Sequence, residues 1–136
     1  MGRPCECGEP DVAVCRSAFD AALATEFSEP EYFAVHHLTV AAYQVQHPQE
    51  YPARGAFEVL RRFLDEGVAP EQMRREITAG NVGIDDPSDW VAVTGALRLS
   101  SVRLADPGAY RDDVERYARS VLEAASRSRR TRRPDR

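Results

Sequence analysis

The segment 29–46, EPEYFAVHHLTVAAYQVQ, is apolar on nearly every side when it is drawn as a helix. Ser28 and Glu31 have the spacing of a capping box, and a proline between them is tolerated in the first turn of a helix. His47 and the proline after it end the helix, because proline disfavours helical backbone in the residue before it. A helix without a polar face must be covered by other helices on several sides. The segment therefore predicts an all-α bundle around one buried helix.

Four other segments have helical spacing and would supply the covering helices. They are residues 12–27, 55–66, 70–77 and 107–126. A break of two residues, Ser28 and Glu29, leads from the first of them into the first turn of the central helix, so we expect these two helices to pack antiparallel as a hairpin. Residues 80–106 fit an extended run as well as an irregular helix, and we assign them neither. The sequence predicts a compact all-α bundle of about five helices with a short N-terminal cysteine turn and an irregular segment at 80–106.

Size and charge describe one acidic domain with a basic end. A chain of 136 residues has the length of one domain and can bury a core without help from a metal. Residues 1–126 contain 12 Arg and 21 acidic residues, a net charge of −9, whereas residues 127–136 contain six Arg and one Asp, a net charge of +5. Because the basic end has nothing to bury, we predict a single helical domain at 1–126 and a disordered Arg-rich tail at 127–136.

Composition also indicates the compartment. No stretch approaches the roughly 20 apolar residues of a membrane-spanning helix, and the N-terminus MGRPCECGEP lacks the apolar region of a secretion signal. Three cysteines are an odd number and suit a reducing compartment better than a disulfide framework. We therefore expect a cytoplasmic protein.

Cys5, Cys7 and Cys15 form a candidate zinc site together with one histidine. Structural zinc takes four nitrogen or sulfur ligands, and a C-x-C-G turn can place two sulfurs on one ion because its glycine relaxes the backbone. In the expected hairpin Cys15 faces about residue 40, so His36 is offset along the axis by about 6 Å and His47 by about 10 Å. We predict His36 as the fourth ligand. His47 is the alternative, because it lies at the end of the hairpin where the cysteine turn must sit.

Two other interpretations of these residues stay open. Three unrelated thiols would give the same pattern, since cysteine is a common core residue. His36, Tyr43 and His47 share one helix face and could line the pocket of a metal-dependent enzyme that acts on a small molecule. The competing interpretation is structural. His36 would be a hydrogen-bonded histidine of the core, and His47 would interact favourably with the helix dipole at the C-terminal end. The sequence has neither a G-x-S-x-G nor an H-E-x-x-H motif, so it does not decide whether the chain is an enzyme.

The basic tail is a candidate nucleic-acid contact through Arg127, Arg129, Arg130, Arg132 and Arg133. Runs of arginine attract phosphate groups because binding releases counterions. No aromatic residue interleaves the run to stack on bases. The composition favours a solvated chain end over a nucleic-acid contact.

The phrases CECG, FDAALATEFSEPEYFAVHHLTVAAYQVQHP and YRDDVERYARSVLEA resemble a family of small bacterial proteins with a domain of unknown function. Its members combine an N-terminal C-P-x-C-G knuckle with a phrase similar to V-H-x-L-T-V-D-x-Y-x-x-Q-H-P. The positions that match are Cys5, Cys7, Cys15, His36, Thr39, Tyr43, Gln46, His47 and Pro48. This chain has C-x-C where the family has C-x-x-C, and Ala41 where the family has Asp. The resemblance implies a helical, zinc-associated, cytoplasmic protein without an established activity.

These observations predict a zinc-stabilised helical module that acts through binding or regulation. A metal-dependent enzyme acting near His36, Tyr43 and His47 is the first alternative, and a nucleic-acid-associated protein is the second. The sequence identifies neither the protein nor the small molecule that such a module would bind.

Overall fold

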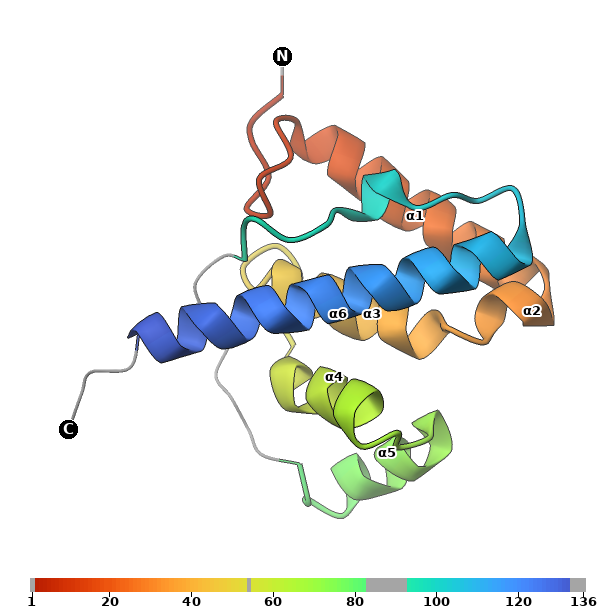
Figure 1. Cartoon of the computed structure of the whole chain (residues 1–136), viewed down its shortest axis with the longest axis vertical. Helices are drawn as coiled ribbons and strands as arrows, with labels where there is room; N and C mark the ends of the chain where they lie inside the picture. Colours follow the sequence, from red (N-terminus) through yellow and green to blue (C-terminus); the bar gives the residue numbers. More distant parts are fainter. Residues whose placement is uncertain (1, 54, 83–92, 133–136) are drawn as a thin grey trace.

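The structure, a computed structural model, describes residues 2–53, 55–82 and 93–132. Over these residues it contains six α-helices, one 3₁₀ turn and no strand, which confirms the all-α prediction. The helices are α1 (Val12–Ser28), α2 (Pro30–Phe33), α3 (His36–Gln46), α4 (Ala56–Asp65), α5 (Pro70–Thr78) and α6 (Pro107–Arg132). In Figure 1, α3 and α6 run through the middle of the molecule, with α1 on one side and α4 and α5 on the other. None of the described helices is long and apolar enough to cross a membrane.

The predicted central helix is in fact two helices. Glu29 has extended backbone (φ −150°, ψ 144°), as expected for a residue before proline, and it separates α1 from α2. A second break follows at Val35, whose backbone (φ −110°, ψ 11°) leads into α3 at His36. The capping box predicted at Ser28 does not form, because this residue ends α1 and its hydroxyl donates to the Thr25 carbonyl at 2.6 Å.

Other helices cover α3 on several sides, as its apolar pattern predicts. It contacts α1, α4 and α6. Its buried side chains are Leu38, Thr39, Ala41, Ala42, Tyr43, Val45 and Gln46. The Tyr43 ring stacks on Phe19 of α1, with the ring centroids 3.9 Å apart. Gln46 accepts a hydrogen bond from the Tyr117 hydroxyl of α6 at 2.7 Å and donates one to the Leu97 carbonyl at 2.9 Å, so its polar atoms are satisfied inside the core.

A buried carboxylate joins α1, α3 and α6. Glu26 of α1 has no exposed surface, and it accepts hydrogen bonds from the hydroxyls of Thr39 in α3 and Tyr110 in α6. The Nδ1 atom of His36, the first residue of α3, lies 2.7 Å from the Glu26 Oε1 atom. Burial and the contact with Glu26 raise the pKa of Tyr110, so its hydroxyl stays protonated and donates. These contacts fix the three helices relative to one another, because a buried carboxylate without donors is strongly unfavourable.

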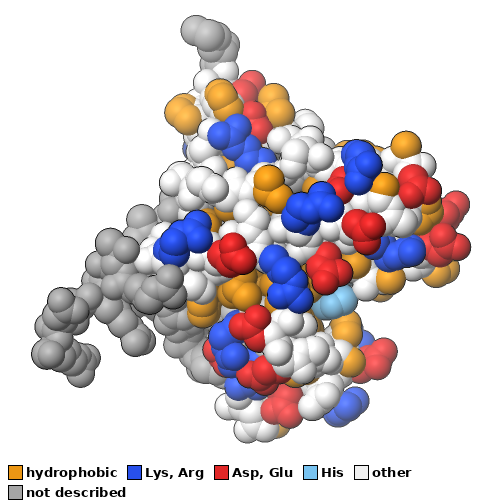
Figure 2. Space-filling model, in the orientation of Figure 1, with side chains coloured by type: hydrophobic (Ala, Val, Ile, Leu, Met, Phe, Trp, Pro, Cys, Tyr) orange, Lys and Arg blue, Asp and Glu red, His pale blue; other side chains and the backbone are white. Residues whose placement is uncertain are grey.

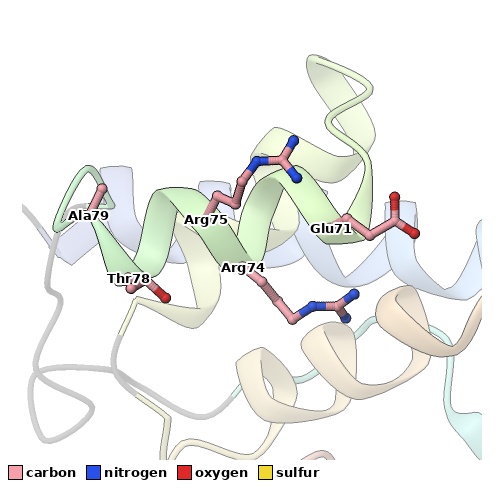
Figure 3. A pocket seen from close by; sticks show the side chains of 5 residues that line it. All are labelled: Glu71, Arg74, Arg75, Thr78 and Ala79. Atoms are coloured by element: carbon pink, nitrogen blue, oxygen red, sulfur yellow. The ribbon is translucent and has the colours of Figure 1, made fainter.

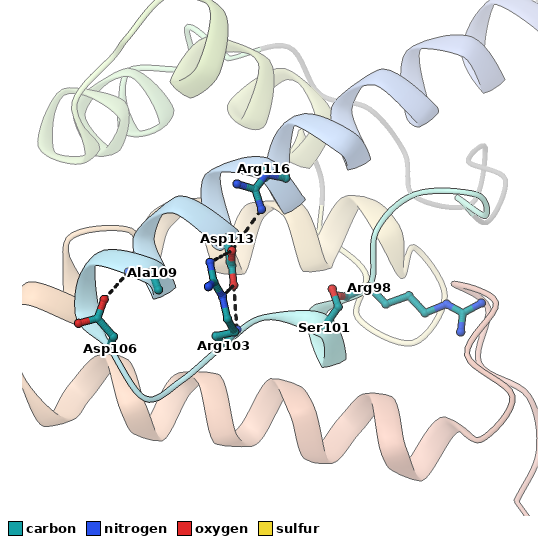
Figure 4. Close-up of polar contacts among 7 residues, drawn as sticks. All are labelled: Arg98, Ser101, Arg103, Asp106, Ala109, Asp113 and Arg116. Carbon is teal, nitrogen blue, oxygen red and sulfur yellow. Dashed lines mark hydrogen bonds and ion pairs between the residues drawn. The ribbon is translucent and has the colours of Figure 1, made fainter.

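The described part of the irregular segment, residues 93–106, contains only the 3₁₀ turn η2 (Leu99–Ser101), which packs on α1. This largely irregular structure is consistent with the sequence analysis, which assigns neither a helix nor a strand to the segment. Residues 83–92 lie outside the described residues. The segment ends at Asp106, whose carboxylate accepts a hydrogen bond from the Ala109 N–H at 2.8 Å (Figure 4). This hydrogen bond satisfies one of the free amides at the start of α6.

The last helix is longer than predicted. The sequence places its end at residue 126 with a disordered tail after it, whereas α6 continues through Arg132. Arginine is a good helix former, cations are favoured in the last turn of a helix, and the next proline comes only at position 134. The helix therefore extends past residue 126 into the segment for which the sequence predicts disorder, and residues 133–136 lie outside the described residues.

Arg103 ties the irregular segment to α6 through Asp113. Its guanidinium donates to the two carboxylate oxygens at 2.9 and 3.0 Å, and its backbone N–H donates to the same carboxylate at 3.0 Å (Figure 4). Arg116 adds a third donor group at 3.3 Å. The hydrogen bonds from Arg103 hold the pKa of Asp113 well below its ordinary value, against the opposing effect of burial.

We expect Asp113→Asn to lower the free energy of unfolding at neutral pH by about 1 kcal/mol, since it weakens a charge-assisted pair whose arginine is exposed. Because the pKa of Asp113 is lower in the folded than in the unfolded chain, its contribution is complete above about pH 4 and is lost as the pH falls further. Urea unfolding of wild type and variant across this range measures the difference. Asp112→Asn, at the exposed neighbouring position, is the control; equal losses in both variants at all pH values would contradict the expectation.

Candidate metal centre

The N-terminal residues form a tight turn that buries two cysteine side chains. The Cys5 N–H donates to the Glu9 carbonyl at 2.8 Å, and the Gly8 N–H donates to the Cys5 carbonyl at 3.0 Å. Gly8 has left-handed backbone (φ 100°), which explains the glycine of C-x-C-G. Cys5 and Cys7 are 5% and 1% exposed. We call residues 3–9 the cysteine knuckle.

Contacts that involve no sulfur hold the cysteine knuckle against the chain after α3. The Glu6 carboxylate accepts hydrogen bonds from the Gln49 N–H at 3.2 Å and from the Glu50 N–H at 2.7 Å. The Arg3 guanidinium lies 2.9 Å from the Glu50 carboxylate. Because Gln49 and Glu50 follow α3 closely, the knuckle lies at the C-terminal end of that helix.

Cys15 meets the knuckle from the first turns of α1. This helix starts at the predicted cap, Asp11, whose carboxylate accepts a hydrogen bond from the Ala13 N–H at 2.9 Å. The buried sulfur of Cys15 lies 3.7 Å from the sulfur of Cys7. The Tyr43 hydroxyl of α3 lies 3.4 Å from the Cys15 sulfur. The start of α1 and the body of α3 therefore both contribute to the surroundings of Cys15.

His47 approaches the same sulfur from the end of α3. Its Nδ1 atom lies 2.8 Å from the backbone carbonyl oxygen of Tyr43. Since a carbonyl can only accept, Nδ1 carries the proton, and Nε2 of the neutral ring keeps its lone pair. This Nε2 atom lies 3.2 Å from the Cys15 sulfur, and the side chain is fully buried. The imidazole is thus held in the tautomer that coordinates metal ions through Nε2.

The ligand atoms of Cys5, Cys7, Cys15 and His47 all lie within 4.8 Å of one another. We call these four residues the Cys₃His cluster. With zinc–sulfur bonds of about 2.3 Å, two sulfurs of a tetrahedral site lie about 3.8 Å apart. The observed separation between Cys7 and Cys15 is 3.7 Å. Three thiolates and one imidazole are donors that structural zinc takes, so the cluster fits this ion.

The electrostatics of the cluster favour negative charge on one sulfur. The hydrogen bond from Cys15 lowers the pKa of the Cys7 thiol to about 3, against the effect of burial. The same hydrogen bond, together with burial, raises the pKa of Cys15, and burial raises that of Cys5. Thiolate is the form that binds metal ions, so a cluster that favours one thiolate is compatible with metal binding.

A family model described as a family of unknown function (DUF5946) matches residues 2–126. The match includes the whole Cys₃His cluster and ends where the basic segment begins. The chain belongs to DUF5946. This membership confirms the resemblance to a family of unknown function, and it assigns no activity. No curated protein and no solved structure matches the chain.

In this member of DUF5946 the cluster contains His47, the alternative ligand, in place of His36. The structure brings the three predicted cysteines together, but His36 lies at the other end of α3 against Glu26. The prediction of His36 assumed one continuous helix with Cys15 opposite residue 40. The knuckle instead lies at the last turn of α3, and this position brings the sulfurs to His47.

Two carboxylates were not identified from the sequence. Glu26 lies on the apolar face of α1, and an acid at such a position is a signal of a buried polar contact. Glu6 stands between two cysteines in a turn, and no sequence signal marks it.

The third histidine, His37, packs against Phe63 with ring centroids 4.6 Å apart, and burial lowers the pKa of His37. It is not one of the residues of the cluster.

A cavity of about 490 Å³ lies against α5, away from the Cys₃His cluster (Figure 3). Its lining residues are Glu71, Arg74, Arg75, Thr78 and Ala79. All five are exposed, and in Figure 3 their side chains point in different directions along one helix. A reaction site needs polar groups that converge on a substrate, so this cavity does not favour catalysis.

We expect Glu6→Ala to increase the reaction rate of the metal-free thiols with a disulfide reagent by about tenfold. The change removes the acceptor of two backbone N–H groups, and a loss of about 1.4 kcal/mol in local stability gives that factor. Stopped-flow thiol titration measures the rate. Glu71→Ala on α5 is the control, and an unchanged rate in Glu6→Ala would show that this carboxylate does not hold the knuckle closed.

Proposed function

We propose that Cys5, Cys7, Cys15 and His47 bind one zinc ion in a closed structural site, and that the zinc-stabilised domain acts through binding or regulation. The observation that carries this proposal is the orientation of His47. The Tyr43 carbonyl requires the proton on Nδ1, and this leaves the Nε2 lone pair 3.2 Å from the Cys15 sulfur. An imidazole held in this way among three buried thiols has the arrangement of a ligand with its supporting hydrogen bond.

Burial supports a structural site over a catalytic one. Each of the four residues is at most 5% exposed. A catalytic zinc ion keeps one position open for water or substrate, whereas four protein ligands close the shell. The alternative of a metal-dependent enzyme near His36, Tyr43 and His47 is less well supported, because His36 is held by Glu26 at the opposite end of α3 and the other two side chains are buried.

A zinc ion at this position would connect three parts of the chain. The cysteine knuckle contributes two sulfurs, α1 contributes one, and the residue after α3 contributes the imidazole. Structural zinc sites add directly to folding free energy when the ligands come from separate segments. Thiolate ligation also agrees with the expected reducing, cytoplasmic environment. Nucleic-acid binding through Arg127–Arg136 remains a prediction of the sequence.

The test is the metal content of protein purified without a polyhistidine tag. We expect one zinc per chain in wild type and in His36→Gln, and less than about half an equivalent in His47→Gln, because only His47 lies in the cluster. Mass spectrometry of the digested protein measures the metal, and circular dichroism shows that each variant is folded. Chelation should lower the melting temperature of wild type.

Two results would refute the proposal. The first is wild-type protein without bound zinc whose melting temperature does not change on chelation. The second is loss of zinc in His36→Gln with retention in His47→Gln, which would restore the original choice of ligand. If His47→Gln is unfolded, cobalt added to metal-free wild type decides the question, since thiolate ligation gives strong visible absorption and its absence excludes the site.

A further inference from the structure

Three aromatic rings form an exposed cluster where α1, α2 and α3 meet. Phe27 and Phe33 are 69% and 43% exposed, which is unusual for large apolar side chains. The His36 ring stacks on Phe33 with centroids 4.6 Å apart and lies 5.1 Å from the Phe27 ring. The two phenyl rings are 5.3 Å apart. We call these three residues the aromatic head.

A contact with the buried interior holds the His36 ring of the aromatic head in place. The buried Glu26 carboxylate lies 2.7 Å from His36 Nδ1 and is itself held by hydroxyls of Thr39 and Tyr110. The imidazole is therefore fixed in position, and the phenyl rings pack on it at the surface. A rigid, exposed aromatic surface costs little conformational entropy on binding, and exposed apolar surface of this kind marks interaction sites.

Exposed acidic residues lie close to α2, the helix that carries Phe33. Glu29, Glu31 and Asp106 are all exposed, and their charges, added to the effect of burial, raise the pKa of the nearby Tyr32. Figure 2 shows acidic side chains, with basic side chains among them, over the end of the molecule where Figure 1 places α2. One cation, Arg111, approaches from α6 and donates to the Glu31 carbonyl at 3.1 Å. Phenyl faces beside carboxylates are suited to arginine, which stacks on aromatic rings and pairs with acids.

The densest basic run of this chain lies at the other end of α6. Residues 127–136 contain six Arg and one Asp, and α6 includes them as far as Arg132. The head adjoins the start of α6, because Tyr110 binds Glu26 and Asp106 caps the helix. A helix of 26 residues is about 39 Å long. The four residues after Arg132 span at most about 14 Å, so the basic end cannot return to the head of its own chain.

We propose that the Arg-rich C-terminal segment 127–136 of a second copy docks on the aromatic head. Its arginines would lie on the faces of Phe27 and Phe33 and pair with Glu29 and Glu31. Head and basic end lie at opposite ends of one long helix, as Figure 1 shows. Two copies with antiparallel α6 helices would therefore exchange their basic ends and form a closed dimer. The proposal does not depend on metal binding.

The first experiment measures the mass of the full chain by sedimentation equilibrium after nuclease treatment. We expect a dimer at low ionic strength and a monomer at high salt, because exposed charge pairs are screened. The variant R129Q/R130Q/R132Q/R133Q should be monomeric under both conditions. A monomeric wild type at every concentration, association only with bound nucleic acid, or an unchanged dimer in this variant would each overturn the proposal.

The second experiment locates the docking site with a labelled peptide of residues 127–136. Binding to the R129Q/R130Q/R132Q/R133Q chain is followed by fluorescence anisotropy. We expect F27S/F33S and E29Q/E31Q each to weaken binding by about tenfold. Asp106 is left unchanged because it caps α6.

Matched controls carry the same chemical changes at other exposed sites. Ile77→Ser on α5 removes an apolar side chain that is 51% exposed, and D20N/E71Q removes two exposed acidic charges. Both controls should bind the peptide as tightly as the parent chain. Equal weakening by controls and head variants would mean that the peptide follows overall charge or apolar surface, and this result would also overturn the proposal.

Discussion

The Glu26 carboxylate must find hydrogen-bond donors inside the protein, and the arrangement of the helices depends on this requirement. It has no exposed surface, and its donors come from α3 and α6. A carboxylate left without donors in such a place would cost several kcal/mol, so α1 can pack only where His36, Thr39 and Tyr110 reach it. The break at Val35 makes this arrangement compatible with the short connection between α1 and α2.

The two ends of α3 have different polar partners, and the apolar middle separates them. At its start the imidazole of His36 serves the buried carboxylate, and at its end the imidazole of His47 faces three sulfurs. Between them the buried side chains of Leu38, Ala42 and Val45 pack among the neighbouring helices. The two histidines that flank α3 at its start and just after its end therefore have different surroundings, because the packing of α1 and of the N-terminal turn places different chemistry at each end.

Much of the fold follows from sequence patterns with simple physical causes. The amphipathic pattern at 55–66 corresponds to α4 (Ala56–Asp65), since glycines with left-handed backbone, Gly55 and Gly67, flank it. Asp11 caps α1 as its side chain predicts. The prediction of one continuous helix at 29–46 failed because the break depends on contacts between distant parts of the chain. The break at Val35 contains no proline or glycine, so local propensity could not reveal it.

The candidate site also combines features that the local sequence indicates with features that depend on the fold. The sequence identified the three cysteines as a group, because their residue type and spacing carry the metal chemistry directly. It placed His47, the histidine that lies in the cluster, second to His36, since that choice depends on where the knuckle folds back. The Glu6 carboxylate decides this position by binding the backbone after α3, and acceptors of backbone N–H groups leave no periodic signal in a sequence.

The attachment of the knuckle through Glu6, Arg3 and Glu50 affects the rate at which an ion would be captured. These contacts need no sulfur, so the four ligand atoms stay near one another before an ion arrives. Uptake of an ion would then be limited by diffusion and by the loss of its hydration water, because the ligand atoms are already in place. A site assembled only by its ion would have to wait for the chain to order. An ion bound at this cluster would then be released and regained without the chain passing through an unfolded state.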